Sequence, residues 1–351
     1  MGEVVTTDGP QEDVVVVPEA PIVPGLSFQR LSGQPDFKIL ADVIQRSRDA
    51  DLYDLVETPE DIANGFRHLQ NCDPSSDMFL VEVKGKLVGF CSCEWHERRD
   101  GVRTYEHNAH LVPEWRVKGL RQVMLRENER RLREISARHP REYAKFFEVR
   151  TNSEDNHWKA LVEEEGYQPF RHNLLMVRSN LDDIPGLPMP GGLEVRPVRS
   201  EHHRIIFRAA EEAFRDEPNF AEEMWTEEGL KAVSEWRMFR PEIWQVAWDG
   251  SKVAGAVLNF IDLEENRKFN RNWGYTMVIF VRRPYRNRGL ASALIARSFE
   301  VLRKEGVSKA ALMVDFENPS GARRLYEKWG YRLFEQFTRY RKPLNEHNDK
   351  S

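Results

Sequence analysis

A short basic segment in the second half of the sequence carries residue types that bind phosphate groups. Residues 282–291 are Arg-Arg-Pro-Tyr-Arg-Asn-Arg-Gly-Leu-Ala, and the apolar run Met-Val-Ile-Phe-Val precedes them at 277–281. Arginine donates several hydrogen bonds to one phosphate, and the first N–H groups of a helix lack an intrahelical partner, so they attract anions. Gly289 and Ala291 would keep side chains away from that backbone. The segment predicts a pyrophosphate site, although a helix N-terminus with solvated arginines has the same pattern.

The elements on either side of this turn follow from the spacing of apolar residues. Residues 277–281 form a continuous apolar run, which is typical of a buried strand. After the turn, five residues share one face of an amphipathic helix that ends near residue 306: Leu290, Leu294, Ser298, Val301 and Leu302. The turn is therefore predicted to join a strand to a helix.

The same order of elements occurs in the first half of the sequence. An Arg-x-x-Gly turn follows a strand and a proline in both halves, and its glycines, Gly119 and Gly289, are 170 residues apart. Each half then ends in a Gly-Tyr pair, and these pairs are 164 residues apart. Self-similarity at a fixed spacing indicates repeated units. We therefore predict a duplicated domain.

Composition divides the chain and limits its function. Residues 182–192 contain three prolines and three glycines and are interpreted as a linker. We predict a mobile leader at 1–25, domains at 26–181 and 193–344, and a tail at 345–351, with Val14 to Val17 as a possible addition to a sheet edge. The acidic net charge of −5 gives no reason to expect nucleic acid, and the sequence has no apolar run of the roughly 18 residues that span a membrane.

The cysteines and the first residues favour the cytoplasm. Three cysteines occur, and we interpret Cys91 and Cys93 as buried thiols of a strand rather than half of a zinc site. No basic segment followed by an apolar stretch precedes a cleavage site, so a secretory signal is not predicted.

Two motifs of the second half resemble those of the GNAT superfamily of acetyltransferases. Residues 286–291 match every fixed position of the family's acetyl-CoA motif, Gln/Arg-x-x-Gly-x-Gly/Ala. Residues 310–318 and 322–331 are similar to its later strand, asparagine and Leu-Tyr-Glu-x-x-Gly-Phe/Tyr helix. Among tandem members the order resembles mycothiol synthase, in which a diverged N-terminal copy precedes an active one. The resemblance implies an α+β fold of two tandem GNAT domains, each a twisted, mostly antiparallel mixed sheet flanked by helices.

The resemblance also implies a reaction and its partners. The expected activity is acetyl-CoA-dependent transfer of an acetyl group to a primary amine of a small molecule, by direct attack in a ternary complex and without a metal. The chain would be a monomer or a homodimer. Transfer of another acyl group and non-catalytic acyl-CoA binding are the alternatives. The implied cofactor contacts are the backbone of Ile279, Phe280 and Val281, the turn formed by Arg286, Asn287, Arg288, Gly289, Leu290 and Ala291, and Asn318.

Two catalytic roles follow from the same resemblance. Tyr326 stands where the family commonly keeps the general acid that protonates the departing thiolate. The glutamate that tandem enzymes tend to place before the turn is missing, so the base stays open. We select Glu217 from a set that also includes Asp216, Asp262, Glu264 and Tyr275 acting through water.

The first half has lost residues at both motifs. Arg121 stands where the second half has Ala291, and Val162 replaces Tyr326. A long side chain at position 121 would block the backbone amides, unless Arg121 itself binds phosphate. We therefore expect one tight coenzyme A site per chain, and we expect a fragment beginning after the linker to keep it.

Overall fold

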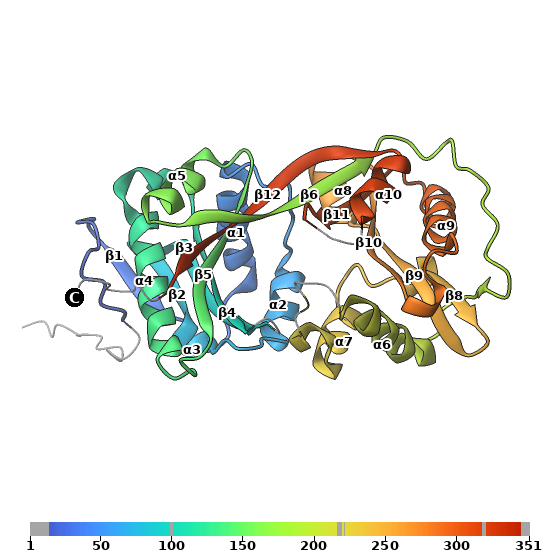
Figure 1. The fold of residues 1–351 in the computed structure, drawn as a ribbon. Coiled ribbons are helices and arrows are strands. Elements are labelled where there is room, and N and C mark those ends of the chain that lie inside the picture. Colours follow the sequence, from blue (N-terminus) through green and yellow to red (C-terminus); the bar gives the residue numbers. More distant parts are fainter. Residues whose placement is uncertain (1–13, 99–100, 216–219, 221, 318–320, 345–351) are drawn as a thin grey trace, which may run out of the picture.

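The computed structural model describes residues 14–98, 101–215, 220, 222–317 and 321–344, and Figure 1 shows the fold. Within these residues twelve strands form one continuous sheet in the order β1-β2-β3-β4-β5-β12-β6-β11-β10-β9-β8-β7. The long ladders are antiparallel, whereas β4 with β5 and β10 with β11 run parallel. This mostly antiparallel mixed sheet, flanked by helices, confirms the predicted α+β fold class.

The two halves of the chain contribute elements in the same order. The first half contains β1 (Leu26–Arg30), α1 (Phe37–Ala50), α2 (Pro59–Arg67), α3 (Pro74–Asp77), β2 (Met78–Val83), β3 (Lys86–Glu97), β4 (Val102–Leu111), α4 (Leu120–Ser136), β5 (Ala144–Asn152), α5 (Asn156–Glu164) and β6 (Gln168–Arg178). The second half contains β7 (Glu194–Val195), α6 (His203–Phe214), α7 (Glu227–Ser234), β8 (Gln245–Asp249), β9 (Lys252–Phe260), α8 (Leu263–Lys268), β10 (Trp273–Val281), α9 (Leu290–Lys304), β11 (Lys309–Asp315), α10 (Ala322–Lys328) and β12 (Tyr331–Pro343).

Local sequence explains where the helices of the site begin. Helix α9 starts directly after Gly289 and buries the predicted apolar face, with Leu294 and Ser298 fully inaccessible to solvent. Helix α8 starts after Asp262, whose carboxylate accepts a hydrogen bond from the N–H of Glu265 at 2.9 Å. Both helices are thereby fixed next to β10.

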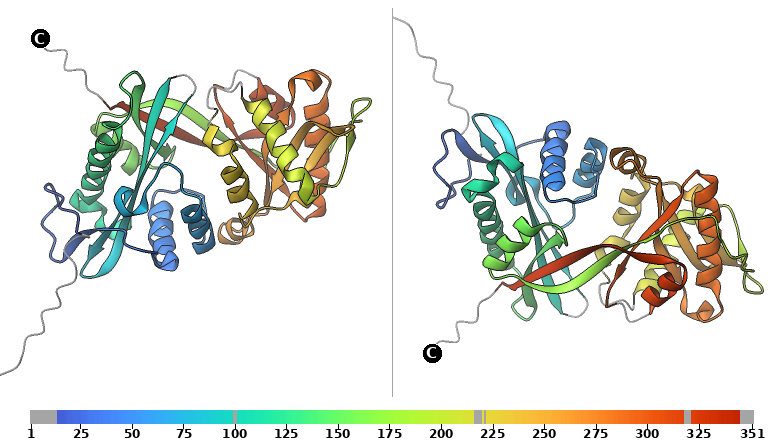
Figure 2. Two further views of the ribbon diagram at one scale, coloured as in Figure 1. Left: turned by 90° about the horizontal axis from the view of Figure 1, so that it is seen from below. Right: turned by 90° about the horizontal axis from the view of Figure 1, so that it is seen from above.

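The last strands of the two halves are exchanged. Strand β6, from the first half, pairs with β11 of the second half, and β12 pairs with β5 of the first half. The two long strands also pair with each other and run across the middle of the molecule, as Figures 1 and 2 show. The sheet therefore continues without interruption from one half into the other.

The exchange also carries side chains into the opposite core. Leu174 and Met176 of β6 belong to the core of the second half. Tyr340 of β12 and Leu344, which comes directly after this strand, both belong to the core of the first half. The predicted domain bounds, 26–181 and 193–344, do not contain this feature. Residues 179–193, which include the predicted linker, form neither helix nor strand.

Part of the predicted leader packs on the sheet. Val14 forms a bridge with Gln29 of β1, and the N–H of Val15 donates to Phe28 at 2.8 Å. Val15 is buried in the core of the first half. Residues 14 and 15 thus extend the sheet edge, which was the alternative interpretation of this segment. Across the described residues, helices are all too short or too polar to cross a bilayer.

Candidate active site

Strands β10 and β11 separate in the middle of the second half. They pair only over three residues, where Trp273, Gly274 and Tyr275 face residues 309–311. Beyond this point β10 continues along β9 as far as Val281, with an irregularity between Thr276 and Val278, while β11 continues along β6. The divergence leaves backbone groups of β10 without a strand partner on one side. An extended ligand could pair with them as a further strand would.

A groove of about 600 Å³ opens where the two strands diverge. Its lining includes most of the residues predicted to contact the cofactor, namely Ile279, Phe280, Val281, Arg286, Asn287, Gly289, Leu290 and Ala291. Arg288 does not line it, and Asn318 lies outside the described residues. One end of β10, the following turn, the start of α9 and α10 therefore meet at a single cavity.

The backbone of the turn fits an anion. Gly289 has φ of 80°, a left-handed conformation that glycine adopts readily, and it precedes α9 without a side-chain cap. Asn287 also has a positive φ, at 60°. A Cβ atom built on Gly289 would meet nothing within 4 Å, so the space beside the turn is open. The first N–H groups of α9 thus border the groove, where a phosphate would compensate them.

The arginines of the turn contact protein carbonyls instead of standing free. Arg286 donates to Val281 at 3.0 Å and to Ala213 at 3.2 Å. Arg288 donates to Gly191 at 3.1 Å. Arg286 therefore holds the turn in shape, and the backbone amides are the donors that the geometry offers to a pyrophosphate. Direct phosphate binding by these side chains stays a prediction.

Tyr326 lies in the same groove, on α10. Its residue is 8 % exposed, and its ring packs edge-on against Tyr331 with centroids 6.1 Å apart. Tyr331 in turn shares a 2.8 Å hydrogen bond with Thr276, at the point where β10 leaves β11. The structure thus brings Tyr326 to the groove from the side opposite β10. A phenol in this place could protonate a leaving group that arrives along the groove.

Of the carboxylates that the sequence offered as candidate bases, the two that the structure describes do not line the groove. Glu217 and Asp216 lie outside the described residues. Asp262 is bound by the guanidinium of Arg237 at 2.7 and 2.5 Å, and Glu264 pairs with Arg267 on the surface of α8. These contacts keep the last two carboxylates away from the groove.

Glu265 is a candidate that sequence reasoning missed. Its carboxylate accepts a short hydrogen bond from the hydroxyl of Tyr275 on β10 and a second from Arg271. Burial raises the pKa of Glu265, and burial together with this carboxylate raises the pKa of Tyr275. The signal was present as Asp262-x-x-Glu265, a capping pattern that starts α8. It marked a helix, but nothing in it indicated that the helix faces Tyr275.

A second cavity, of about 310 Å³, lies at the other end of the divergence. Tyr275 and Met277 of β10 line it, whereas Ile279 and Val281 line the groove, so successive parts of one strand border the two cavities. Both halves contribute to the second cavity, which is lined by Arg48, Asp54, Leu55, Val56, Glu57, Asp61, Leu175, Trp236, Arg237, Met238, Asp262, Glu265, Tyr275, Met277, Met313 and Phe337. Two reactants could therefore meet at β10 from different cavities.

Residues 206–331, which contain the turn, the groove and Tyr326, match the model of the Acetyltransferase (GNAT) family. The second half of the chain therefore contains a GNAT acetyltransferase domain. It is 25 % identical over 268 residues to a mycothiol acetyltransferase of Geodermatophilus obscurus, a match that covers 75 % of this chain and 82 % of the relative. The family match confirms the predicted acyltransferase class.

Solved GNAT structures share the tandem fold. A GCN5-related N-acetyltransferase from Sphaerobacter thermophilus superposes with a TM-score of 0.64 at 24 % identity, covering 92 % of this chain and 96 % of that one. A tandem GNAT protein from the clavulanic acid biosynthesis pathway gives 0.63 at 14 % identity, covering 92 % and 100 %. Both likenesses extend over both halves and support the predicted tandem arrangement.

The first GNAT copy keeps the turn but has a long side chain where the second copy has Ala291. Gly119 has φ of 69° before α4, as Gly289 has before α9. Arg121 is 4 % exposed, and its guanidinium binds both carboxylate oxygens of Asp51, at 3.0 and 2.7 Å, while its Nε donates to Ala109 at 3.0 Å. Val162, which replaces Tyr326, is fully buried in the core. The guanidinium of Arg121 is therefore engaged by Asp51, and both residues line a cavity of about 290 Å³ in the first half.

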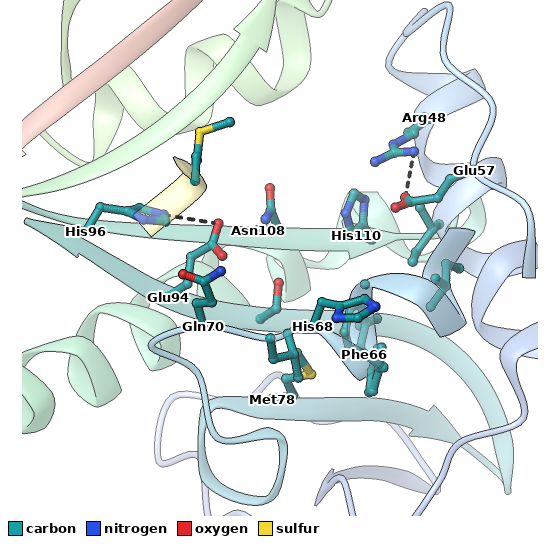
Figure 3. Close-up of a pocket in the computed structure, with 17 residues that line it drawn as sticks. Arg48, Glu57, Phe66, His68, Gln70, Met78, Glu94, His96, Asn108 and His110 are labelled. Carbon is teal, nitrogen blue, oxygen red and sulfur yellow. Dashed lines mark ion pairs between the residues drawn. The ribbon is translucent and has the colours of Figure 1, made fainter. Parts of the chain in front are cut away.

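The first copy also has a cavity of about 380 Å³ with polar and apolar lining on its sheet, shown in Figure 3. Alternate residues of β3 and β4, including Glu94, His96, Asn108 and His110, point into it. Glu94, His96 and Glu106 lie close enough together to suggest a metal site. Glu106, however, already accepts hydrogen bonds from Arg339 at 3.0 Å and Arg150 at 3.3 Å.

Cys91 and Cys93 are buried in β3, as predicted, and burial raises the pKa of both thiols.

Proposed function

We propose that the chain is an acetyl-CoA-dependent N-acetyltransferase that transfers the acetyl group to the primary amine of a small molecule. The observation that carries the proposal is the course of β10 past two cavities. The groove at residues 279–281 ends in an anion-binding turn, and the cavity at Tyr275 and Met277 contains carboxylates. A thioester and an amine that occupy these cavities would meet beside the same strand.

The donor would occupy the groove along its length. Its pantetheine arm would pair with the backbone of residues 279–281, and its pyrophosphate would take the N–H groups of the turn at residues 287–291. Main-chain N–H groups of β10 would also stabilise the oxyanion that develops on the thioester carbonyl. The pyrophosphate would thus accept hydrogen bonds from the first N–H groups of α9, which have no partner within the helix.

An ammonium acceptor loses two protons on its way to the amide, of which the departing thiolate takes up the equivalent of one and solvent receives the other. Alkyl amines have a pKa near 10, as lysine does, so a group must take the proton of the attacking nitrogen. We assign this role to Glu265, acting through Tyr275 or water. The nitrogen forms a bond to the carbonyl carbon, the carbon–sulfur bond breaks, and Tyr326 gives its proton to the sulfur. The hydroxyl of Tyr326 then regains a proton from solvent.

The first copy would serve as a scaffold rather than as a second enzyme. Arg121 replaces the small residue of its turn and is held by Asp51, and five residues between 54 and 61 line the second cavity. One donor site per chain follows from this arrangement. The three cysteines are free, which agrees with a reducing compartment, and we place the enzyme in the cytoplasm.

The proposal is tested by coenzyme A release with acetyl-CoA and a panel of amines. Amine-dependent release, together with an acetylated product identified by mass spectrometry, would support it. Release that occurs only with another acyl-CoA would favour the wider acyltransferase alternative. Tight acetyl-CoA binding without turnover for any amine would favour a non-catalytic acyl-CoA-binding protein and would refute the proposal.

A further inference from the structure

The second cavity has apolar walls supplied by both halves and by the exchanged strands. The apolar residues that line it include Leu55, Val56, Leu175, Trp236, Met277 and Met313. Met277 is 45 % exposed and Met313 is 48 % exposed although both line the cavity. Apolar surface that remains open inside a cavity favours a ligand with an apolar body.

The charges around the cavity do not balance. Arg237 bridges two carboxylates, binding Asp61 at 2.6 Å and Asp262 at 2.5 Å. Arg271, just behind the wall, likewise bridges Asp54 at 3.1 Å and Glu265. Each arginine is shared by two carboxylates, so these four carboxylates face two arginines and the set carries two more negative than positive charges. The remaining pair of the wall, Arg48 with Glu57 at 2.8 Å, is balanced and does not reduce this surplus.

One carboxylate oxygen of this set lacks a donor. Asp61 has a side chain only 10 % exposed and lines the cavity. Its Oδ2 accepts hydrogen bonds from Arg237 and from the N–H of Thr58. Its Oδ1 is buried, and no residue in the described part of the chain donates to it. A buried acceptor without a donor is costly, so a ligand with an N–H group would stabilise this arrangement.

A neighbouring buried carboxyl also has a raised pKa, to which Asp54 of this set contributes after burial. Glu335 of β12 faces Leu175 across the ladder, on the strand that also supplies Phe337 to the cavity. Its pKa is raised to about 7 by burial and then by Asp54. A carboxyl that resists ionisation agrees with a site that already holds more negative than positive charge.

We infer that the acceptor is a cationic amine carried on an apolar body and bearing no anionic group. The inference rests on the proposed function, since it names the acceptor of that reaction. The ammonium offsets the surplus charge and donates to the carboxylates, and the apolar body covers the methionine and tryptophan walls. A carboxylate or phosphate on the acceptor would add negative charge where carboxylates already outnumber arginines, so such amines are excluded.

Binding of matched amines to the full chain tests this class without relying on turnover. Coenzyme A is added to fill the groove, and phenethylamine, phenylalanine and glucosamine are titrated separately by calorimetry. Phenylalanine differs from phenethylamine by one carboxylate, and glucosamine keeps the amine but lacks the apolar body. We expect phenethylamine to bind at least about tenfold more tightly than either of the others. Equal affinities, or tighter binding of phenylalanine or glucosamine, would overturn the inference.

A pair of variants locates the effect in the cavity. Asp54→Asn removes one surplus charge and should weaken phenethylamine binding about tenfold while leaving coenzyme A binding unchanged. Asp49→Asn is the matched control, because Asp49 forms an exposed ion pair with Lys268 across the halves and does not line the cavity. Equal effects of the two substitutions would overturn the assignment.

Measurements of turnover distinguish a failure of this inference from a failure of the proposed function. Tight phenethylamine binding without amine-dependent release of coenzyme A would refute the proposed function and support the cavity's ligand class. Efficient acetylation of glucosamine or phenylalanine in preference to phenethylamine would support the proposed function and overturn the acceptor class.

Discussion

Replacing Glu335 by glutamine should stabilise the protein, and only above the acidic range. Glu335 belongs to the exchanged strand β12, is 8 % exposed, and its Oε1 has no hydrogen-bond partner among the described residues. Burial, followed by the nearby carboxylate of Asp54, raises its pKa from 4.5 to about 7. Glutamine keeps the size and polarity of the side chain but cannot ionise. The substitution therefore removes the cost of the charge alone.

The sign and size of the effect follow from that shift. Below about pH 4.5 the carboxyl is protonated in both the folded and the unfolded chain, so ionisation costs no stability. As the pH rises, the unfolded chain ionises first, and the folded state loses stability until the pH passes about 7. The full loss is on the order of 3 kcal/mol, and the glutamine variant should recover most of it at pH 8.

Thermal unfolding at two pH values measures the difference. With an unfolding entropy of about 2.1 cal/mol/K per residue, 3 kcal/mol corresponds to a rise in Tm of roughly 4 °C for a chain of 351 residues. We expect this rise at pH 8 and almost none at pH 4.5. Glu264→Gln, on the exposed face of α8, is the control and should show no such dependence on pH. A Glu335→Gln variant with the same Tm as the parent at pH 8 would refute the reasoning.

Two further predictions concern the donor groove. Tyr326→Phe should lower kcat by about 100-fold or more with little change in the KM for acetyl-CoA, because a general acid acts only as the thiolate leaves. If the variant keeps the wild-type kcat from about pH 6 to 9, Tyr326 has a structural role and is not the general acid. Gly289→Glu should abolish coenzyme A binding, since the carboxylate would stand where the pyrophosphate binds. Because Arg121 stands in the first copy where the second has Ala291, we expect no second site to remain. Titration of the parent protein should give one site per chain, and two equivalent sites would contradict the role given to Arg121.

The donor groove could be predicted from the sequence because its chemistry is local. Residues 277–291 contain the end of a strand, a glycine in the left-handed conformation and the start of a helix. The residue types of this short segment predict each of these backbone conformations. Gly289 and Ala291 were identified from this pattern, and both line the groove. The duplication followed from the repeated order of elements, and the mostly antiparallel fold was implied by the resemblance to the GNAT superfamily.

The acceptor cavity could not be predicted because its residues come from separate elements. Asp54 and Asp61 belong to the first copy, whereas Glu265 and Tyr275 belong to the second, and only packing brings them together. Alternation along β6 and β12 predicts strands but does not reveal which neighbour each strand pairs with. The pairing of β6 with β11 is a tertiary choice that leaves no local signal.

The exchanged strands change what a fragment of this protein should do. From the sequence we expected a chain beginning after the linker to keep the coenzyme A site. In the structure, such a chain retains β11 and β12 but lacks β6, which lies between them. It also loses Leu174 and Met176 from the core that supports β10, each worth about 2 kcal/mol of burial. Its strand β12 would lose its partner β5 as well.

We therefore predict that residues 188–351 expressed alone do not bind acetyl-CoA, although they contain the whole groove. A cut after Leu187, which is 40 % exposed in an irregular segment, should be tolerated when both pieces are present. Coexpressed fragments 1–187 and 188–351 should copurify and bind one acetyl-CoA per pair, because β6 and β12 can still pair with their exchanged neighbours. Full affinity in the isolated fragment 188–351 would mean that β12 can replace β6 beside β11, and that the exchange is not required to form the donor site.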